Sequence, residues 1–162
     1  MITFSCSKID AAFDPLVSGI TTTKAEAKLG SKIWKDRGYS ISSISDELVG
    51  NILFQPPHYV NAGTMSINAN RNAEAFITLY EEGDREGGLM EVLQANGWTL
   101  KNDWYLEWSN QHKLNKVWSK KINGGETVSF TSTKNKMTFA ILVKEGRNLI
   151  KRLYVKSCIS TS

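Results

Sequence analysis

The feature that most constrains the fold of this chain is a series of short strand-like segments separated by residues that favour tight turns. In residues 64–69 apolar and polar side chains alternate, which is typical of a strand with one buried face. Residues 73–80 show the same character after a short polar turn, so the two segments are predicted to form a hairpin. The side chains predicted to face the core are Met65, Ile67 and Ala69 in the first segment and Ala75, Ile77 and Leu79 in the second.

The same pattern extends over most of the chain. Further strands are predicted at residues 33–39, 40–44, 51–55, 104–109, 114–122, 127–131, 137–143 and 149–156. The Asn123-Gly124-Gly125 sequence is typical of a hairpin turn, because Asn and Gly tolerate a positive φ. Helical spacing occurs only at residues 23–29 and 89–96, the second of which should end at Gly97. We therefore predict an all-β antiparallel sandwich, jelly-roll or Greek-key-like, with one or two short helices and a single domain over residues 1–162.

The chain has two cysteines, one near each end. Cys6 and Cys158 both lie in alternating segments that are typical of terminal strands, and chain termini often lie close together. A disulfide between them would stabilise the fold by ~5 kcal/mol in the chain-entropy model. It would also indicate an oxidising, extracellular compartment. The alternative is a pair of unrelated, half-buried thiols.

Composition excludes several classes of function. No apolar run approaches the ~20 residues of a membrane span, and the first residues do not resemble a signal peptide. Lys and Arg number 20 against 16 Asp and Glu, a small excess that permits an acidic partner without requiring one. No aromatic ladder alternates with basic residues, which argues against nucleic acid as a partner.

Catalytic patterns are absent from the sequence. His58 and His112 are the two histidines, both are expected in surface loops, and their spacing does not indicate a zinc site. No serine lies in a Gly-x-Ser-x-Gly elbow, and the glycines near residue 83 have acidic neighbours that would repel phosphate. We therefore do not expect an enzyme.

An acidic loop follows the strand predicted at residues 73–80. It places four carboxylates in six positions, on a glycine-containing segment of the kind that can hold calcium. These residues are Glu81, Glu82, Asp84 and Glu86. The spacing differs from that of an EF-hand and Arg85 interrupts it, so a solvated charged turn is the alternative to a calcium site.

Aromatic and amide residues gather between positions 96 and 111. A sugar-binding site needs an apolar platform with a few well-placed polar partners, and this segment contains both. Alternation in residues 104–108 places Trp104, Leu106 and Trp108 toward the core, and Tyr105 and Glu107 toward solvent. Basic residues near the C-terminus, Arg152 among them, are predicted to form an exposed stripe that would attract acidic polymers; protection of an edge strand against aggregation is the alternative role for these charges. The predicted ligand-binding residues are Trp98, Asn102, Asp103, Tyr105, Glu107 and Arg152.

Several phrases of the sequence resemble a known family. They are Lys32-Ile33-Trp34-Lys35-Asp36-Arg37-Gly38-Tyr39, the Leu48-Val49-Gly50 turn with its Phe54-Gln55 strand end, Gly87-Gly88-Leu89 with Gly97-Trp98, and residues 114–120. Together they resemble a small β-sandwich module of secreted animal and bacterial proteins, often found beside carbohydrate-active domains. The resemblance covers residues 27–143 and rests on residues that support folding. Among them are Asp36 and Arg37, which we expect to form either an ion pair or a cap at a strand corner. It implies an extracellular adhesion or glycan-associated module and assigns no catalytic residue.

Two functions are consistent with these observations. The first is a secreted, non-enzymatic, lectin-like module that binds a glycan, with acidic glycans included. The second is a structural or adhesion protein that binds another extracellular protein or forms a homodimer. A glycan binder should expose aromatic and amide groups in a concave region, whereas a structural module should present an apolar patch or a bare edge strand.

Overall fold

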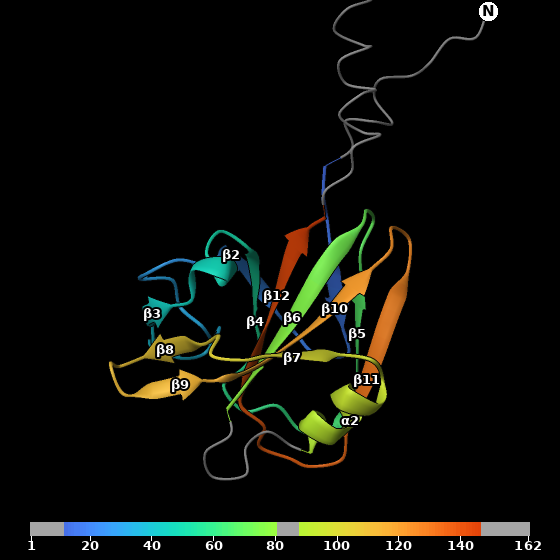
Figure 1. Cartoon of the computed structure of the whole chain (residues 1–162). Helices are drawn as coiled ribbons and strands as arrows, with labels where there is room; N and C mark the ends of the chain where they lie inside the picture. The colour runs from blue at the N-terminus through green and yellow to red at the C-terminus, as the bar shows by residue number, and fades with distance from the viewer. Residues whose placement is uncertain (1–11, 81–87, 147–162) are drawn as a thin grey trace, which may run out of the picture.

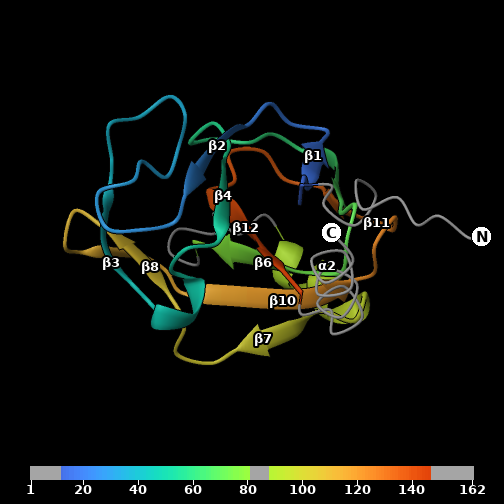
Figure 2. The ribbon, with the colours of Figure 1, turned by 90° about the horizontal axis from the view of Figure 1, so that it is seen from above.

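A six-stranded antiparallel sheet forms the centre of the molecule. The computed structural model describes residues 12–80 and 88–146, and three antiparallel sheets are found there (Figures 1 and 2). The central sheet has the strand order β2-β4-β12-β6-β10-β7. Its strands are β2 (Thr23–Glu26), β4 (Ile52–Gln55), β12 (Phe139–Glu145), β6 (Ala73–Leu79), β10 (Lys116–Ile122) and β7 (Thr99–Lys101).

Two three-stranded sheets and two short helices complete the described fold. One small sheet has the order β1-β5-β11 and the other has the order β3-β8-β9. Their strands are β1 (Leu16–Ser18), β5 (Gly63–Asn68) and β11 (Thr127–Ser132), then β3 (Ile41–Ile44), β8 (Leu106–Trp108) and β9 (His112–Leu114). The helices are the 3₁₀ turn η1 (Asp46–Leu48) and the α-helix α2 (Leu89–Ala95).

The inner strands of the central sheet are buried on both faces. Along β6, Ala75, Ile77 and Leu79 face one hydrophobic core, which also receives side chains from β5, β11 and α2. The alternate residues Phe76 and Tyr80 face a second core, closed by the β3-β8-β9 sheet and by the connection that contains Trp34. The predicted all-β antiparallel sandwich is thus confirmed. Its largest sheet has a hydrophobic core on each face.

Most of the elements predicted from periodicity are present. Met65, Ile67 and Ala69 face the core as predicted, each with at most 1% of its surface exposed. Residues 89–96 contain the predicted helix α2, and Gly97 follows it with φ +82°, a left-handed conformation that glycine adopts without a Cβ penalty. These features depend on residues close together in sequence, where periodicity is most informative.

Two predicted elements are wrong. Residues 23–29 do not form a helix, because Thr23–Glu26 pairs with β4 as an edge strand and gains ladder hydrogen bonds that a short isolated helix could not match. Residues 33–39 do not form a strand but a loop closed by a bridge between Lys32 and Ser40. The apolar side chains at positions 33 and 34 are buried in the second core, so their apolar character reflects tertiary packing and not a strand ladder.

The two predicted hairpins are also wrong, because consecutive strands enter different sheets. β5 pairs with β1 and β11, whereas β6 pairs with β10 and β12. The Asn123-Gly124-Gly125 turn does form, with Gly125 at φ +87°, but it connects β10 to β11 across the sandwich. There the backbone N–H of Gly124 donates to Asn72 Oδ1 at 2.9 Å, so the two sheet-to-sheet connections pack against each other.

Some predictions about strands and the disulfide lie outside the described residues: the strand at 149–156, the terminal strands around Cys6 and Cys158, and the disulfide between those cysteines. The interpretation of residues 1–162 as one domain likewise stays a prediction. Within residues 12–80 and 88–146, no helix is long and apolar enough to cross a membrane.

Candidate functional site

A shallow groove opens where two neighbouring chain segments leave the central sheet and enter the β3-β8-β9 sheet. On the central-sheet side Lys101 pairs with Val117, and on the other side Leu106 pairs with Leu114. Between these pairs one segment has four residues, 102–105, and its neighbour has two, 115 and 116. The longer segment cannot stay in register, and the space beside it forms a groove of about 400 Å³.

The turn at the start of the longer segment presents polar side chains to this groove. Asn102 and Asp103 follow β7 directly and are exposed, and Asp103 has φ +67°. Asp and Asn adopt this left-handed conformation more readily than most residues, which explains their use at this turn. Asn115, the single residue between β9 and β10, lines the groove from the opposite segment.

Two aromatic side chains, three lysines and Leu100 form the rest of the lining. Trp104 is half-buried, and its ring lies 5.7 Å from that of Phe76 in the second core. Lys101 Nζ lies 5.4 Å from the centre of the Trp104 ring, and Lys113 Nζ lies 4.6 Å from the centre of the Tyr105 ring. The full lining is Leu100, Lys101, Asn102, Asp103, Trp104, Tyr105, Lys113, Asn115 and Lys116.

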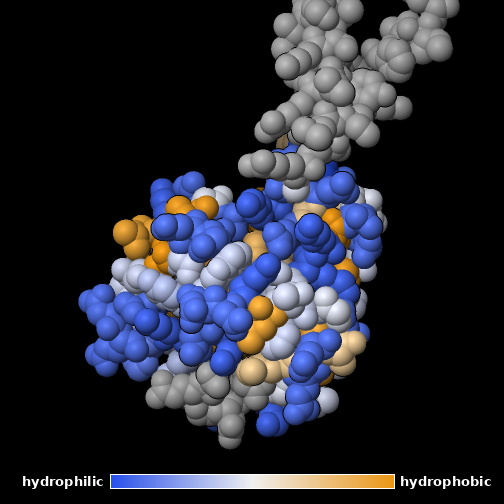
Figure 3. All heavy atoms as spheres, in the orientation of Figure 1, coloured by the Kyte–Doolittle hydropathy of each residue, from blue (hydrophilic) through white to orange (hydrophobic). Residues whose placement is uncertain are grey.

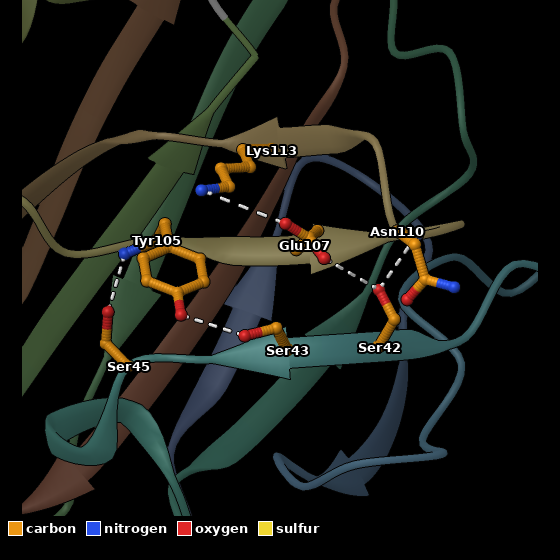
Figure 4. Close-up of polar contacts among 7 residues, drawn as sticks. All are labelled: Ser42, Ser43, Ser45, Tyr105, Glu107, Asn110 and Lys113. Atoms are coloured by element: carbon orange, nitrogen blue, oxygen red, sulfur yellow. Dashed lines mark hydrogen bonds and ion pairs between the residues drawn. The ribbon is translucent and has the colours of Figure 1, made fainter.

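Two serines hold Tyr105 in place: Ser43 in β3 and Ser45, the residue that follows β3 (Figure 4). Its hydroxyl and the Ser43 hydroxyl are 2.8 Å apart and share a hydrogen bond. Its backbone N–H donates to Ser45 Oγ at 2.7 Å, and Ser45 is 9% exposed. The Tyr105 hydroxyl and backbone are therefore both held, which reduces the conformational entropy that this residue would lose on binding a ligand.

Glu107 lies beside the groove and contacts it through Lys113. The two residues are opposite each other in the β8–β9 ladder, so their side chains share one face, with Lys113 Nζ 3.8 Å from Glu107 Oε2. The Ser42 hydroxyl donates to the other carboxylate oxygen at 3.3 Å (Figure 4). The surface over β8 and β9 is largely hydrophilic (Figure 3).

The structure brings together part of the predicted ligand-binding set. Asn102, Asp103 and Tyr105 line the groove, and Glu107 adjoins it. Trp98 does not join them, because it is 4% exposed and packs edge-on against Phe130 in the first core. Arg152 lies outside the described residues, as do the predicted calcium ligands Glu81, Glu82, Asp84 and Glu86. Within the described ranges, no group of three or more His, Cys, Asp or Glu side chains is placed to hold a metal ion.

The prediction did not include several lining residues. Trp104 was expected only in the core because alternation was extended across residues 104–108, but β8 begins at Leu106 and the two residues before it follow no strand period. The pairing of strands that are distant in sequence brings four of these residues to the groove: Lys101, Lys113, Asn115 and Lys116. Their sequence signal is a basic or amide residue within or beside a short strand, which is too common to identify a site.

The histidines and the Asp36-Arg37 pair have structural surroundings. His58 was expected at the surface but is 7% exposed, with its ring 4.6 Å from that of Trp34. His112 lies in β9, half-buried, with its ring stacked 5.3 Å from Trp108. The predicted Asp36–Arg37 ion pair is confirmed at 3.2 Å, and Asp36 Oδ1 also accepts a hydrogen bond from the backbone N–H of His58.

Comparisons with known proteins identify the fold. No model of a known protein family matches the chain, and no curated protein matches it significantly. Among solved structures, the chain is similar to a β-glucuronidase from glycoside hydrolase family 2, with a TM-score of 0.60 and 12% identity. It is also similar to a GH138 enzyme targeting pectin rhamnogalacturonan II, with a TM-score of 0.57 and 17% identity.

The likeness concerns a small part of each of these enzymes. In both cases it covers 83% of this chain but only 14% of the first enzyme and 16% of the second. At these identities the likeness shows the fold alone. This chain therefore has a β-sandwich fold that also occurs within carbohydrate-active enzymes.

Proposed function

We propose that this chain is a non-enzymatic carbohydrate-binding module whose saccharide lies in the groove between the β7–β8 and β9–β10 connections. The observation that carries the proposal is the convergence of Trp104, Tyr105, Asn102 and Asn115 on one concave surface. Aromatic faces pack against the C–H groups of a sugar ring, and side-chain amides donate to and accept from its hydroxyls. The occurrence of this fold in two carbohydrate-active enzymes supports the proposal.

The groove chemistry favours binding over catalysis. Glycoside hydrolysis ordinarily uses two carboxyl groups that flank the scissile bond. Within the described part of the chain, the groove lining has one carboxylate, that of Asp103, while the adjoining Glu107 is engaged by Ser42 and Lys113. We include an extracellular location in the proposal because of the disulfide expected between Cys6 and Cys158. Alkylation of both thiols without a reductant would count against that location.

Removal of the two groove amides is expected to weaken saccharide binding about thirtyfold. Each amide contributes hydrogen bonds worth roughly 1 kcal/mol, and 1.4 kcal/mol corresponds to a factor of ten. A glycan array of the native protein identifies the saccharide, and titration calorimetry then compares it with the Asn102→Ala, Asn115→Ala double variant.

A matched control for this experiment is Asn123→Ala. Asn123 is an exposed amide at the opposite end of β10, so its removal should leave the affinity unchanged. A blank array from folded protein would contradict the proposed function. Equal losses in the double variant and the control would place the binding site outside the groove.

A second candidate function, self-association, is favoured by an apolar hollow beside the edge strand β3. The hollow has a volume of about 510 Å³, and two of its side chains, Leu29 and Val49, are 65% and 49% exposed. Figure 3 shows hydrophobic surface in this upper-left region, above β3. Lys28 and Asp46 also line the hollow and would complement each other across a two-fold axis.

If self-association occurs there, the Leu29→Ser, Val49→Ser double variant should convert a dimer to a monomer in sedimentation velocity. The control is Leu16→Ser, which removes a leucine of similar exposure, 53%, from β1. A native protein that sediments as a monomer at high concentration would remove this candidate function.

A further inference from the structure

We infer that the groove selects acidic saccharides, such as those containing uronic acids, and that Lys101, Lys113 and Lys116 recognise the carboxylate. This inference rests on the proposed function of the groove and adds the chemical class of its ligand. It does not depend on the basic stripe near Arg152, which lies outside the described residues.

The lining of the groove carries a net positive charge. Three lysines face the groove, whereas Asp103 is the only carboxylate among the described lining residues. A concave surface with low-dielectric walls focuses the potential of the charges around it, so this excess has more effect in the groove than on a flat surface. Glu107 partly offsets the charge of Lys113, from which it lies 3.8 Å away, but the described lining stays net positive even when this carboxylate is included.

Two of these lysines are held beside aromatic rings of the groove. Lys101 and Lys113 each place their ammonium group near the face of an aromatic residue of the same groove, at 5.4 Å and 4.6 Å from the ring centres. Cation–π attraction restrains side chains that would otherwise extend freely into water. The ammonium groups therefore lie beside the two rings on which a sugar would pack.

Edge-strand protection is the competing explanation for these lysines. β7 and β9 are both edge strands, and lysine on an edge strand hinders pairing with another sheet. That role requires only exposure, and it does not require the lysines of two separate sheets to converge on one groove. The lysines converge where the register difference opens the groove. Because edge protection does not explain this convergence, we assign these lysines to a ligand.

The proposed site divides recognition among three kinds of group. Trp104 and Tyr105 provide apolar faces for a sugar ring, and the two amides provide hydrogen bonds to hydroxyls. The lysines provide charge-assisted hydrogen bonds to a carboxylate, which are roughly twice as strong as hydrogen bonds between neutral groups. A neutral saccharide would use only the first two and should bind more weakly.

The test compares one saccharide in two charge states. A short oligogalacturonate and its fully methyl-esterified form share the same sugar rings, and only the first carries carboxylates at neutral pH. Titration calorimetry with the native protein should give an affinity for the acid at least about tenfold higher than for the ester, and this difference should shrink as salt is added.

Two variants of equal charge separate the groove from the rest of the surface. The Lys101→Gln, Lys113→Gln, Lys116→Gln variant should bind the acid and the ester with equal affinity. The control variant, Lys121→Gln, Lys134→Gln, Lys144→Gln, removes the same charge from exposed positions outside the groove lining and should keep the preference for the acid. Circular dichroism and thermal unfolding confirm that both variants are folded.

Each outcome decides the inference. Equal native affinities for acid and ester, or a glycan array positive for neutral saccharides only, would overturn it and leave the proposed function intact. Loss of the preference in the control variant would also overturn it, by assigning the attraction to the overall charge of the domain. A blank array would remove the inference together with the proposed function.

Discussion

Replacement of Trp34 by alanine should lower the free energy of unfolding by about 4 kcal/mol, within the range for a fully buried aromatic residue. Trp34 is 0% exposed although it lies in a loop, and its ring packs edge-on against Trp108 with the ring centres 4.8 Å apart. Its Nε1 donates to the backbone carbonyl of Phe139 in β12 at 3.1 Å. The side chain therefore attaches the loop of residues 33–39 to the central sheet, and urea unfolding measures the loss.

The matched control is Tyr39→Ala in the same loop. The Tyr39 ring lies 6.2 Å from the Trp34 ring but is 44% exposed, so its removal should cost about 1 kcal/mol. A Trp34 variant that loses no more stability than the Tyr39 variant would show that the loop is not part of the second core. Trp34→Phe should lie between the two, because it keeps a ring but leaves the Phe139 carbonyl without its donor.

Replacement of Gly19 by alanine should lower the free energy of unfolding by about 3 kcal/mol, from a left-handed backbone penalty and a steric clash. Gly19 follows β1 with φ +89°, and a Cβ at this position would lie 2.2 Å from the backbone oxygen of Thr64 in β5. The strand β1 would have to move away from β5 to accommodate it. Chemical denaturation measures the global loss, and hydrogen exchange of the β1 amides detects local release of the strand.

Gly30→Ala is the control for this prediction. Gly30 has the same φ of +89°, but nothing lies within 4 Å of a Cβ built on it. Its replacement should cost only the left-handed penalty of about 1 kcal/mol. Equal losses in the two variants would mean that the contact between Gly19 and β5 contributes nothing to stability.

Where the sequence predicted the fold correctly, neighbouring residues carried the information. The alternation of Met65 and Ile67 in β5 identifies a strand with one buried face, because successive side chains point to opposite sides. The apolar spacing of Leu89 and Leu93 and the following Gly97 identify α2 in the same way. The loop around Trp34 misled the prediction because burial in a tertiary core gives a loop the apolar composition of a strand.

The candidate site was predictable only in part, for a related reason. Asn102, Asp103 and Tyr105 are close in sequence and include a turn, so composition located one side of the groove. The other side, Lys113, Asn115 and Lys116, reaches it through the β8–β9 and β10–β7 pairings. Trp98 was included because it is near in sequence, but it packs against Phe130 of β11, a contact that sequence distance does not indicate.

By itself the sequence determined the all-β class, most strand positions and the helix before Gly97, since these depend on periodicities of two and 3.6 residues along the chain. Tertiary structure alone decided which strands share a sheet, because pairing depends on contacts between distant residues. These long-range contacts place β5 and β6 in different sheets and put a hydrophobic core on each side of the central sheet. They also produce the register difference beside Lys101. The groove exists because of that difference, and it unites in one site residues that the linear sequence keeps apart.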